Sequence, residues 1–262
     1  MAIAPATAEA IRARAPKVVT SGETLDFRTL VPQPGGLFDY KVFGPGTVID
    51  APPPDLDAPA RPPKTQFARL VLPAPVVHPL ALARAPARLA ALAGWSEDEV
   101  RACRGGDAAR RRIAELAAAL DASPDGRAFV VRELPVLSPD LRPLIRLDDD
   151  RWQTSPINEL YRHVMRRTQR LGKAIEAGGP PSSIDTELAG LHVALEHLFE
   201  NEDCAEPLRD VRGELLTSLR GLAGGTTHLF DAVGALAAGA PTTGRLHRAS
   251  SVLFALGFEL AA

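Results

Sequence analysis

Two adjacent heptad patterns place the strongest constraint on the fold of this chain. Ser155-Pro156 is a typical helix start, and Gly178-Gly179-Pro180-Pro181 is a stretch that a helix does not cross. On each side of that stretch, seam positions recur at alternating spacings of four and three, which predicts an antiparallel coiled-coil hairpin with arms of about 30 Å. The seam residues are Ile157, Tyr161, Val164, Thr168, Leu171 and Ile175, followed by Ile184, Leu188, Leu191, Leu195 and Leu198.

The outer faces of the two predicted arms carry opposite charges. These charges either pair between the arms, which would only solubilise the hairpin, or form a face that binds a partner. The pattern alone leaves both interpretations open. The first arm shows Arg162, Arg166, Arg167, Arg170 and Lys173, and the second shows Asp185, Glu187, Glu196 and Glu200.

The rest of the chain predicts a mixed fold of the α+β class, mainly helical. Short apolar runs with turn signals in 17–46, and alternation in 67–77 and 129–137, are typical of strands, whereas 86–121 favours helices. We expect an irregular β-containing base that carries the protruding hairpin. The expected divisions are a disordered N-terminus at 1–16, a base at 17–147 with a Pro-rich connector at 51–64, the hairpin at 148–204, and a C-terminal helical segment at 205–262.

Composition argues against several classes of protein. The formal net charge of the 262 residues is −2, without the basic excess of most free-standing nucleic-acid binders. Cys103 and Cys204 stand far apart, so a four-ligand zinc site is unsupported. Asp148, Asp149 and Asp150 are consecutive and cannot all point at one ion, so we interpret them as a solvated turn. We find neither a signal peptide nor an apolar run of about 20 residues, and expect a cytoplasmic protein with no membrane contact.

Two blocks of sequence resemble the bacterial RNA polymerase β′ subunit. Residues 24–45, TLDFRTLVPQPGGLFDYKVFGP, are similar to the pattern (I/L)xYRT(L/F)xPxxxGLFxxxIFGP that opens the β′ clamp. Residues 129–177 contain LPVLSPDLRPL followed by SPINELYRHVMRRTQRL, similar to LPVLPPDLRPL and (S/T)xLNxLYRxVIxRNxRL in that family. The resemblance covers roughly 17–46 and 66–220, and it is to the N-terminal clamp region.

The resemblance implies a role for the hairpin. In the β′ family the corresponding helices are the clamp helices, where the sigma factor docks. Basic residues of the first arm and Glu187 of the second would make charge-assisted contacts, and Ala194 would permit close approach. Leu160, Tyr161 and Leu171 would form seam and core. The resemblance carries over Arg167, Arg170, Glu187 and Ala194, and the charge pattern of the first arm adds Arg162 and Arg166 as candidate partner-binding residues.

Other parts of the β′ pattern are missing. The connector 51–64 stands in place of the four-cysteine zinc ribbon, and 219–225, LRGLAGG, in place of a Lys/Arg-rich stretch that contacts DNA. The NADFDGD loop, whose aspartates hold magnesium, is absent. We therefore expect no catalytic residues and no zinc or magnesium site in this chain. DNA contact should be weak or occur only within a complex.

Three hypotheses for the function remain. The chain is a non-catalytic β′-like module that binds a sigma factor or core polymerase, a piece of a split or truncated β′ subunit, or a decaying gene copy. The family is a nucleotidyltransferase, but this chain lacks the catalytic aspartates, so the sequence leaves open whether it is part of an enzyme. The intact heptads of 155–201 argue against decay, although Ala68-Arg69-Leu70 replaces the family's Gly-His-Ile.

Overall fold

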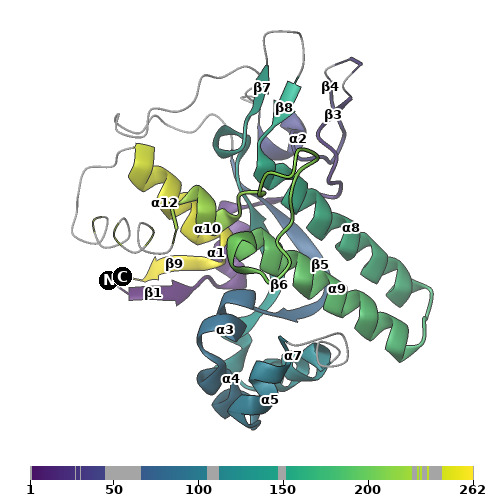
Figure 1. The fold of residues 1–262 in the computed structure, drawn as a ribbon, viewed down its shortest axis with the longest axis vertical. Helices are drawn as coiled ribbons and strands as arrows, with labels where there is room; N and C mark the ends of the chain where they lie inside the picture. Colours follow the sequence, from purple (N-terminus) through teal and green to yellow (C-terminus); the bar gives the residue numbers. More distant parts are fainter. Residues whose placement is uncertain are drawn as a thin grey trace.

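The structure is a computed structural model, and it describes residues 2–26, 28–29, 31–44, 66–104, 112–146, 152–225, 229, 231, 235 and 244–261. The expected connector 51–64 and the acidic turn of Asp148, Asp149 and Asp150 lie outside these residues. The predicted class is confirmed, because the fold is α+β and mainly helical (Figure 1).

A long strand, β5 (Ala68–Val77), organises the base. It lies between β2 (Lys17–Val18), which runs parallel to it, and β6 (Val130–Val136), which runs antiparallel. The register of β5 against β6 shifts between Val71 and Val76, where prolines at 73 and 75 remove two N–H donors from the ladder. This sheet, with the hairpin helices packed on it, contains most of the main hydrophobic core.

Shorter elements surround the sheet. The segment 25–43 forms a small two-stranded unit and one helical turn, and a second two-stranded unit leads into the hairpin. Both units lie at the same end of the molecule (Figure 1). The elements are β3 (Leu25–Asp26), β4 (Val31–Pro32), α2 (Tyr40–Phe43), η2 (Pro139–Leu141), β7 (Leu144–Arg146) and β8 (Trp152–Thr154).

A compact helical unit with its own apolar core follows β5. Ser96 and Glu99 form a capping box at the start of α5, with Ser96 Oγ accepting from the Glu99 N–H and the Glu99 carboxylate accepting from the Ser96 N–H. The elements are α3 (Pro79–Arg84), α4 (Pro86–Ala93), α5 (Glu97–Ala102), α7 (Ile113–Ala122) and η1 (Gly126–Phe129).

The N-terminal segment 1–16, expected to be disordered, contains a strand and a helix within its described residues. The strand β1 (Ala2–Pro5) pairs antiparallel with β9 (Phe258–Ala261), which brings the two ends of the chain together (Figure 1). The helix α1 (Ala8–Arg14) follows, and Ile11 is buried. Its Arg14 guanidinium lies 3.8 Å from the centre of the Phe254 ring. The strand β9 and Phe254 both belong to the C-terminal end of the chain, so no local sequence signal could predict these contacts.

The hairpin consists of α8 (Pro156–Glu176) and α9 (Pro181–Glu200), which lie side by side with their turn at the edge of the molecule (Figure 1). It protrudes over less of its length than expected. The second half of α9, from Ala194 to Glu200, is buried against β5, α3 and α7. The projecting part is therefore the end near the turn.

The C-terminal segment is only partly helical. Within the segment 205–262, which we expected to be helical, residues 205–217 form an irregular loop with a turn closed by the Arg209–Leu215 bridge. Most of 226–243 lies outside the described residues. The elements here are η3 (Asn201–Asp203), α10 (Leu219–Leu222) and α12 (Gly244–Ala255), which packs against β6, β9 and α10.

Candidate functional site

The base of the hairpin rests on a buried arginine, Arg142, which is fully inaccessible to solvent. Its guanidinium donates to the carbonyl oxygens of Leu137 and Leu37, at 2.8 and 2.7 Å, and to Asn158 Oδ1 at 3.0 Å. It also lies over the ring of Phe43, 4.8 Å from the centroid. Burial lowers the pKa of Arg142 to about 9, so the group still carries its charge at neutral pH.

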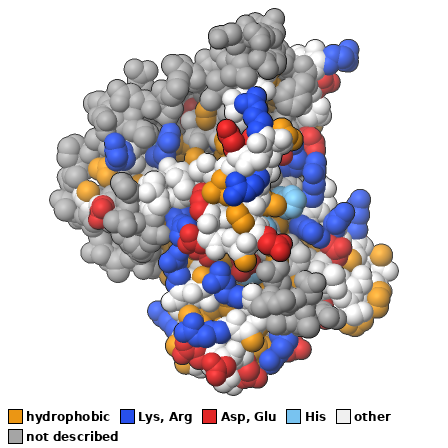
Figure 2. All heavy atoms as spheres, viewed as in Figure 1, with side chains coloured by type: hydrophobic (Ala, Val, Ile, Leu, Met, Phe, Trp, Pro, Cys, Tyr) orange, Lys and Arg blue, Asp and Glu red, His pale blue; other side chains and the backbone are white. Residues whose placement is uncertain are grey.

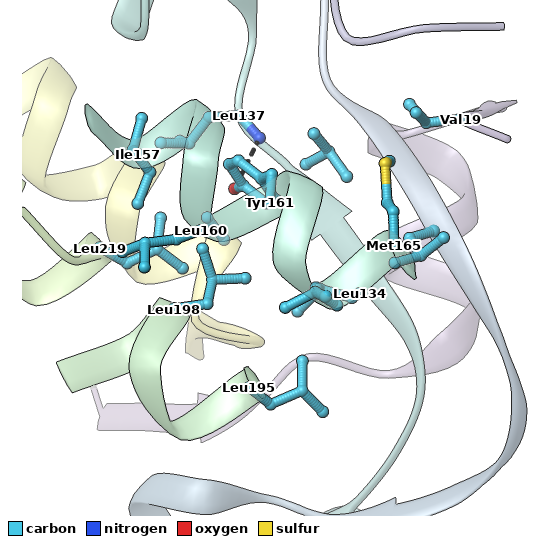
Figure 3. Packing of buried hydrophobic residues seen from close by; sticks show 14 of the residues in the cluster. Val19, Leu134, Leu137, Ile157, Leu160, Tyr161, Met165, Leu195, Leu198 and Leu219 are labelled. Atoms are coloured by element: carbon cyan, nitrogen blue, oxygen red, sulfur yellow. Dashed lines mark hydrogen bonds between the residues drawn. The ribbon is translucent and has the colours of Figure 1, made fainter. Parts of the chain in front are cut away.

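The first turns of α8 complete this anchor. Asn158 donates from Nδ2 to the Arg142 carbonyl at 3.2 Å and to Thr154 Oγ1 at 2.7 Å. The hydroxyl oxygen of Tyr161 accepts from the Leu137 N–H at 3.1 Å (Figure 3). The two sequence blocks that resemble β′ therefore meet at one buried hydrogen-bond network, which fixes where α8 leaves the base.

The predicted seam holds the two helices together. Ile157, Tyr161, Val164 and Leu171 on α8 are fully buried, as are Leu191, Leu195 and Leu198 on α9. Near the turn the seam opens, because Ile175 is 39% exposed and Ile184 is only partly buried. Apolar packing therefore fixes the hairpin at its base and leaves its end accessible.

Two of the predicted arginines are held by the chain itself. Arg162 forms an ion pair with Glu159 at 2.8 Å, and Gly22 lies directly against its side chain. Arg167 reaches across to α9, where it approaches Glu187 at 3.7 Å and lies over Gly190. A side chain at position 190 would displace this guanidinium. The interpretation that charges pair between the arms therefore holds at Arg167–Glu187.

A basic groove of about 390 Å³ lies on the exposed face of α8. Three of its cations, Arg166, Arg170 and Lys173, are exposed and form no ion pair within the described part of the chain. Figure 2 shows Lys and Arg side chains together with a histidine over this part of the molecule. We call this surface the basic groove; its lining residues are His163, Arg166, Arg167, Gln169, Arg170 and Lys173.

His163 belongs to the basic groove but was not among the predicted site residues. It stands one helical turn before Arg166 and Arg167, and that spacing of three and four was the signal available in the sequence. Burial lowers its pKa, and Arg167, His197 and Arg166 lower it further. The imidazole is therefore neutral at pH 7, and the positive charge of the groove comes from the arginines and Lys173.

Three residues expected on the outer face of α9 lie inside the protein. Ala194 is 2% exposed and packs in the main core, so it cannot contact a partner as predicted. Glu196 and Glu200 are also buried, at 7% and 2% exposure. The reason is tertiary, because α3, α7 and β5 cover this side of α9. The acidic residues left accessible on α9 are Asp185 and Glu187.

Glu200 instead closes an ion-pair cluster at the foot of the hairpin. Its carboxylate lies 3.1 Å from Arg84 and 3.7 Å from Arg104, which belong to the helical unit after β5, and 3.9 Å from Arg220 on α10. Three separate parts of the chain are thereby tied to α9. Because the Glu200 carboxylate is buried, this cluster positions the hairpin and is not available to a partner.

Metal ligation finds no support in the described residues, where no group of three or more His, Cys, Asp or Glu side chains could hold an ion. Within the same residues, no helix has the length and apolar character needed to cross a membrane.

Comparisons with known proteins point to one protein class. No family model matches the chain. The β′ subunit of DNA-directed RNA polymerase from Mycoplasma capricolum is 41% identical over 91 residues, which is 35% of this chain and 7% of that subunit. The β′ subunit of Corynebacterium kroppenstedtii is 35% identical over 122 residues, 47% of this chain and 9% of that subunit. The Cutibacterium acnes β′ subunit is 35% identical over 111 residues, 42% of this chain and 9% of its own length.

These similarities establish a β′-like region within the chain. The chain spans less than a tenth of the length of the curated relatives it matches. The resemblance predicted from the two sequence blocks is therefore confirmed for part of the chain.

Proposed function

We propose that this chain is a β′-like clamp module in DNA-templated transcription, which binds a partner through the basic groove and does not itself transfer nucleotides. The observation that carries the proposal is the pairing of a β′-like region with Arg166, Arg170 and Lys173, exposed cations left unpaired by the described residues. The β′ catalytic loop is absent from the sequence.

The groove favours an acidic protein surface as its ligand. Clustered guanidinium groups bind carboxylates with charge-assisted, directional hydrogen bonds, and the anchored base holds them in a fixed arrangement. We propose that the partner is a sigma factor or the core polymerase. The alternative is a structural piece of a split β′ subunit, which would contribute to polymerase activity only inside the assembled complex. We place this module in the cytoplasm, where transcription occurs, and propose that its DNA contact is weak outside a complex.

The experiment is a pull-down of the purified chain with the principal sigma factor and, separately, with core polymerase. Arg170→Glu is the test variant, because Arg170 is exposed and its loss breaks no internal ion pair among the described residues. Arg88→Glu makes the same charge change on α4, outside the residues that line the groove, and serves as the control. Arg167→Glu is less clean, since it also breaks the contact with Glu187.

Sigma capture that Arg170→Glu reduces at least tenfold, and Arg88→Glu leaves unchanged, is the result we expect. Capture by core polymerase alone supports the split-subunit alternative. Capture of neither partner, or equal capture by all variants, contradicts binding through the groove.

A further inference from the structure

Arg167 lies in the wall of the basic groove and is also held by the neighbouring helix α9. Its Nη1 lies 3.7 Å from Glu187 Oε2, and its guanidinium lies over Gly190, one turn further along α9. The helices α8 and α9 run side by side, so this contact crosses the hairpin (Figure 1). In this position Arg167 directs part of its charge at α9 rather than at a ligand in the groove.

Glu187 is turned toward Arg167. Its side chain is 25% exposed, and Oε2, the oxygen nearest Arg167, is covered from solvent. The 3.7 Å separation is longer than the roughly 2.7–3.2 Å of a hydrogen bond between nitrogen and oxygen. The attraction is therefore that of a partly exposed ion pair, which water screens. A carboxylate from outside can form shorter, directional hydrogen bonds to the same guanidinium and replace Glu187.

Gly190 provides the space that this contact needs. A methyl group at position 190 would lie 3.0 Å from Arg167 Nη1 and 3.2 Å from its Cζ. Both atoms are at the end of a flexible side chain, so the methyl group would move the guanidinium and leave the helices in place. Glycine is unfavourable in the interior of a helix, and this close approach gives a physical reason for its position within α9.

We propose that Glu187 is an internal competitor for Arg167, which a partner's carboxylate must replace before the groove binds with its full charge. Gly190 is the positioning residue that lets Arg167 reach this competitor. Because Glu187 is always beside Arg167, it excludes neutral and weakly acidic surfaces, and the partner class is a protein segment with several adjacent carboxylates. This role presupposes the partner binding proposed for the basic groove, and it reverses the assignment of Glu187 as a residue that contacts the partner.

The test measures binding of a fluorescein-labelled polyglutamate peptide to the full chain by fluorescence anisotropy, with polyglutamine as the neutral peptide. Glu187→Gln removes the charge of the competitor. Gly190→Ala removes the space for Arg167 and changes no charge. We expect each variant to tighten polyglutamate binding by about two- to fivefold, the range that corresponds to a partly exposed ion pair.

Two matched controls should leave the affinity unchanged. Glu9→Gln removes the same charge on α1, outside the residues that line the groove, and Gly172→Ala adds a methyl group to α8 where it meets open space. In an Arg167→Leu background Gly190→Ala should have no effect, because no guanidinium is left to displace. Circular dichroism checks that each variant is folded.

The outcomes separate this role from the groove itself. Binding that Arg170→Glu abolishes, but that Glu187→Gln and Gly190→Ala leave unchanged or weaken, overturns the internal competitor and leaves the groove as a binding site. An effect of Gly190→Ala that persists with Arg167→Leu does the same. No polyglutamate binding by any variant, or binding that Arg170→Glu does not reduce, overturns both this role and the preference of the groove for acidic ligands.

Discussion

The guanidinium of Arg142 donates to the amide oxygen of Asn158 at 3.0 Å, and both side chains are fully buried. Arg142 follows a 3₁₀ turn at the end of the base, whereas Asn158 is in the first turn of the hairpin. A third segment joins them through the Leu37 carbonyl, 2.7 Å from the same guanidinium. The hairpin therefore emerges from the base at a fixed place, because one cation satisfies acceptors from three segments.

Replacing Arg142 should destabilise the whole fold. Arg142→Met keeps most of the side-chain volume but leaves the Leu37 and Leu137 carbonyls and the Asn158 amide without their donor. We expect the free energy of unfolding to fall by about 3–5 kcal/mol, measured by urea denaturation. Arg132→Met removes an exposed ion pair with Asp121 and should cost less than about 1 kcal/mol. Equal losses would contradict the anchoring role of Arg142.

Protonation of His78 should destabilise the protein as the pH falls. Burial lowers its pKa in the folded state to about 4, from 6.5 for an exposed imidazole. The folded state thus disfavours the proton, so this contribution is full above pH 6.5 and is lost progressively toward pH 4. The shift corresponds to about 3 kcal/mol.

The measurement for His78 compares unfolding free energies between pH 6.5 and pH 4. His78→Phe cannot take up the proton, so its stability should fall less steeply over this range than that of the unmodified chain. Carboxylates titrate in both proteins and cancel in the difference. Parallel curves for the two proteins would show that His78 does not titrate as a buried group.

Removing the negative charge of Glu200 should loosen the foot of the hairpin. Glu200→Gln leaves Arg84, Arg104 and Arg220 without a buried carboxylate between them. We expect a loss of about 2–4 kcal/mol in thermal or urea unfolding. Glu97→Gln, which breaks an exposed pair with Arg101 one turn away on α5, is the matched control and should change stability by less than about 0.5 kcal/mol.

Asn201 should control the loop that follows the hairpin. Its side chain is fully buried, donates to the Leu208 and Leu216 carbonyls at 2.9 and 2.8 Å, and accepts from the Leu208 N–H at 2.8 Å. Asn201→Ala removes all three bonds, at a cost of about 2–3 kcal/mol.

Limited trypsin digestion tests this prediction, because Arg209 and Arg212 lie within the loop. Cleavage there should accelerate in Asn201→Ala while cleavage elsewhere stays slow. A variant cut at all sites at the same increased rate would indicate general unfolding rather than release of this loop.

Local signals in the sequence specify the hairpin and the capping box. Heptad spacing, Ser155-Pro156 and the Gly-Pro turn act over a few residues, so the helices begin and end near the predicted positions. The two resembling blocks likewise predict a β′-like region that the comparisons confirm. The basic residues of the first arm were predicted from the same periodicity.

The tertiary structure alone decides which of those residues are accessible. Glu200 is buried because Arg84, 116 residues earlier in the chain, packs against it, and Arg142 reaches a carbonyl 105 residues away. The strand β1 forms only because β9 returns to pair with it. The helices and the charges along them follow from local sequence, because both depend on neighbouring residues. Their burial, and so the groove that remains exposed, depends on contacts between distant segments that no local pattern encodes.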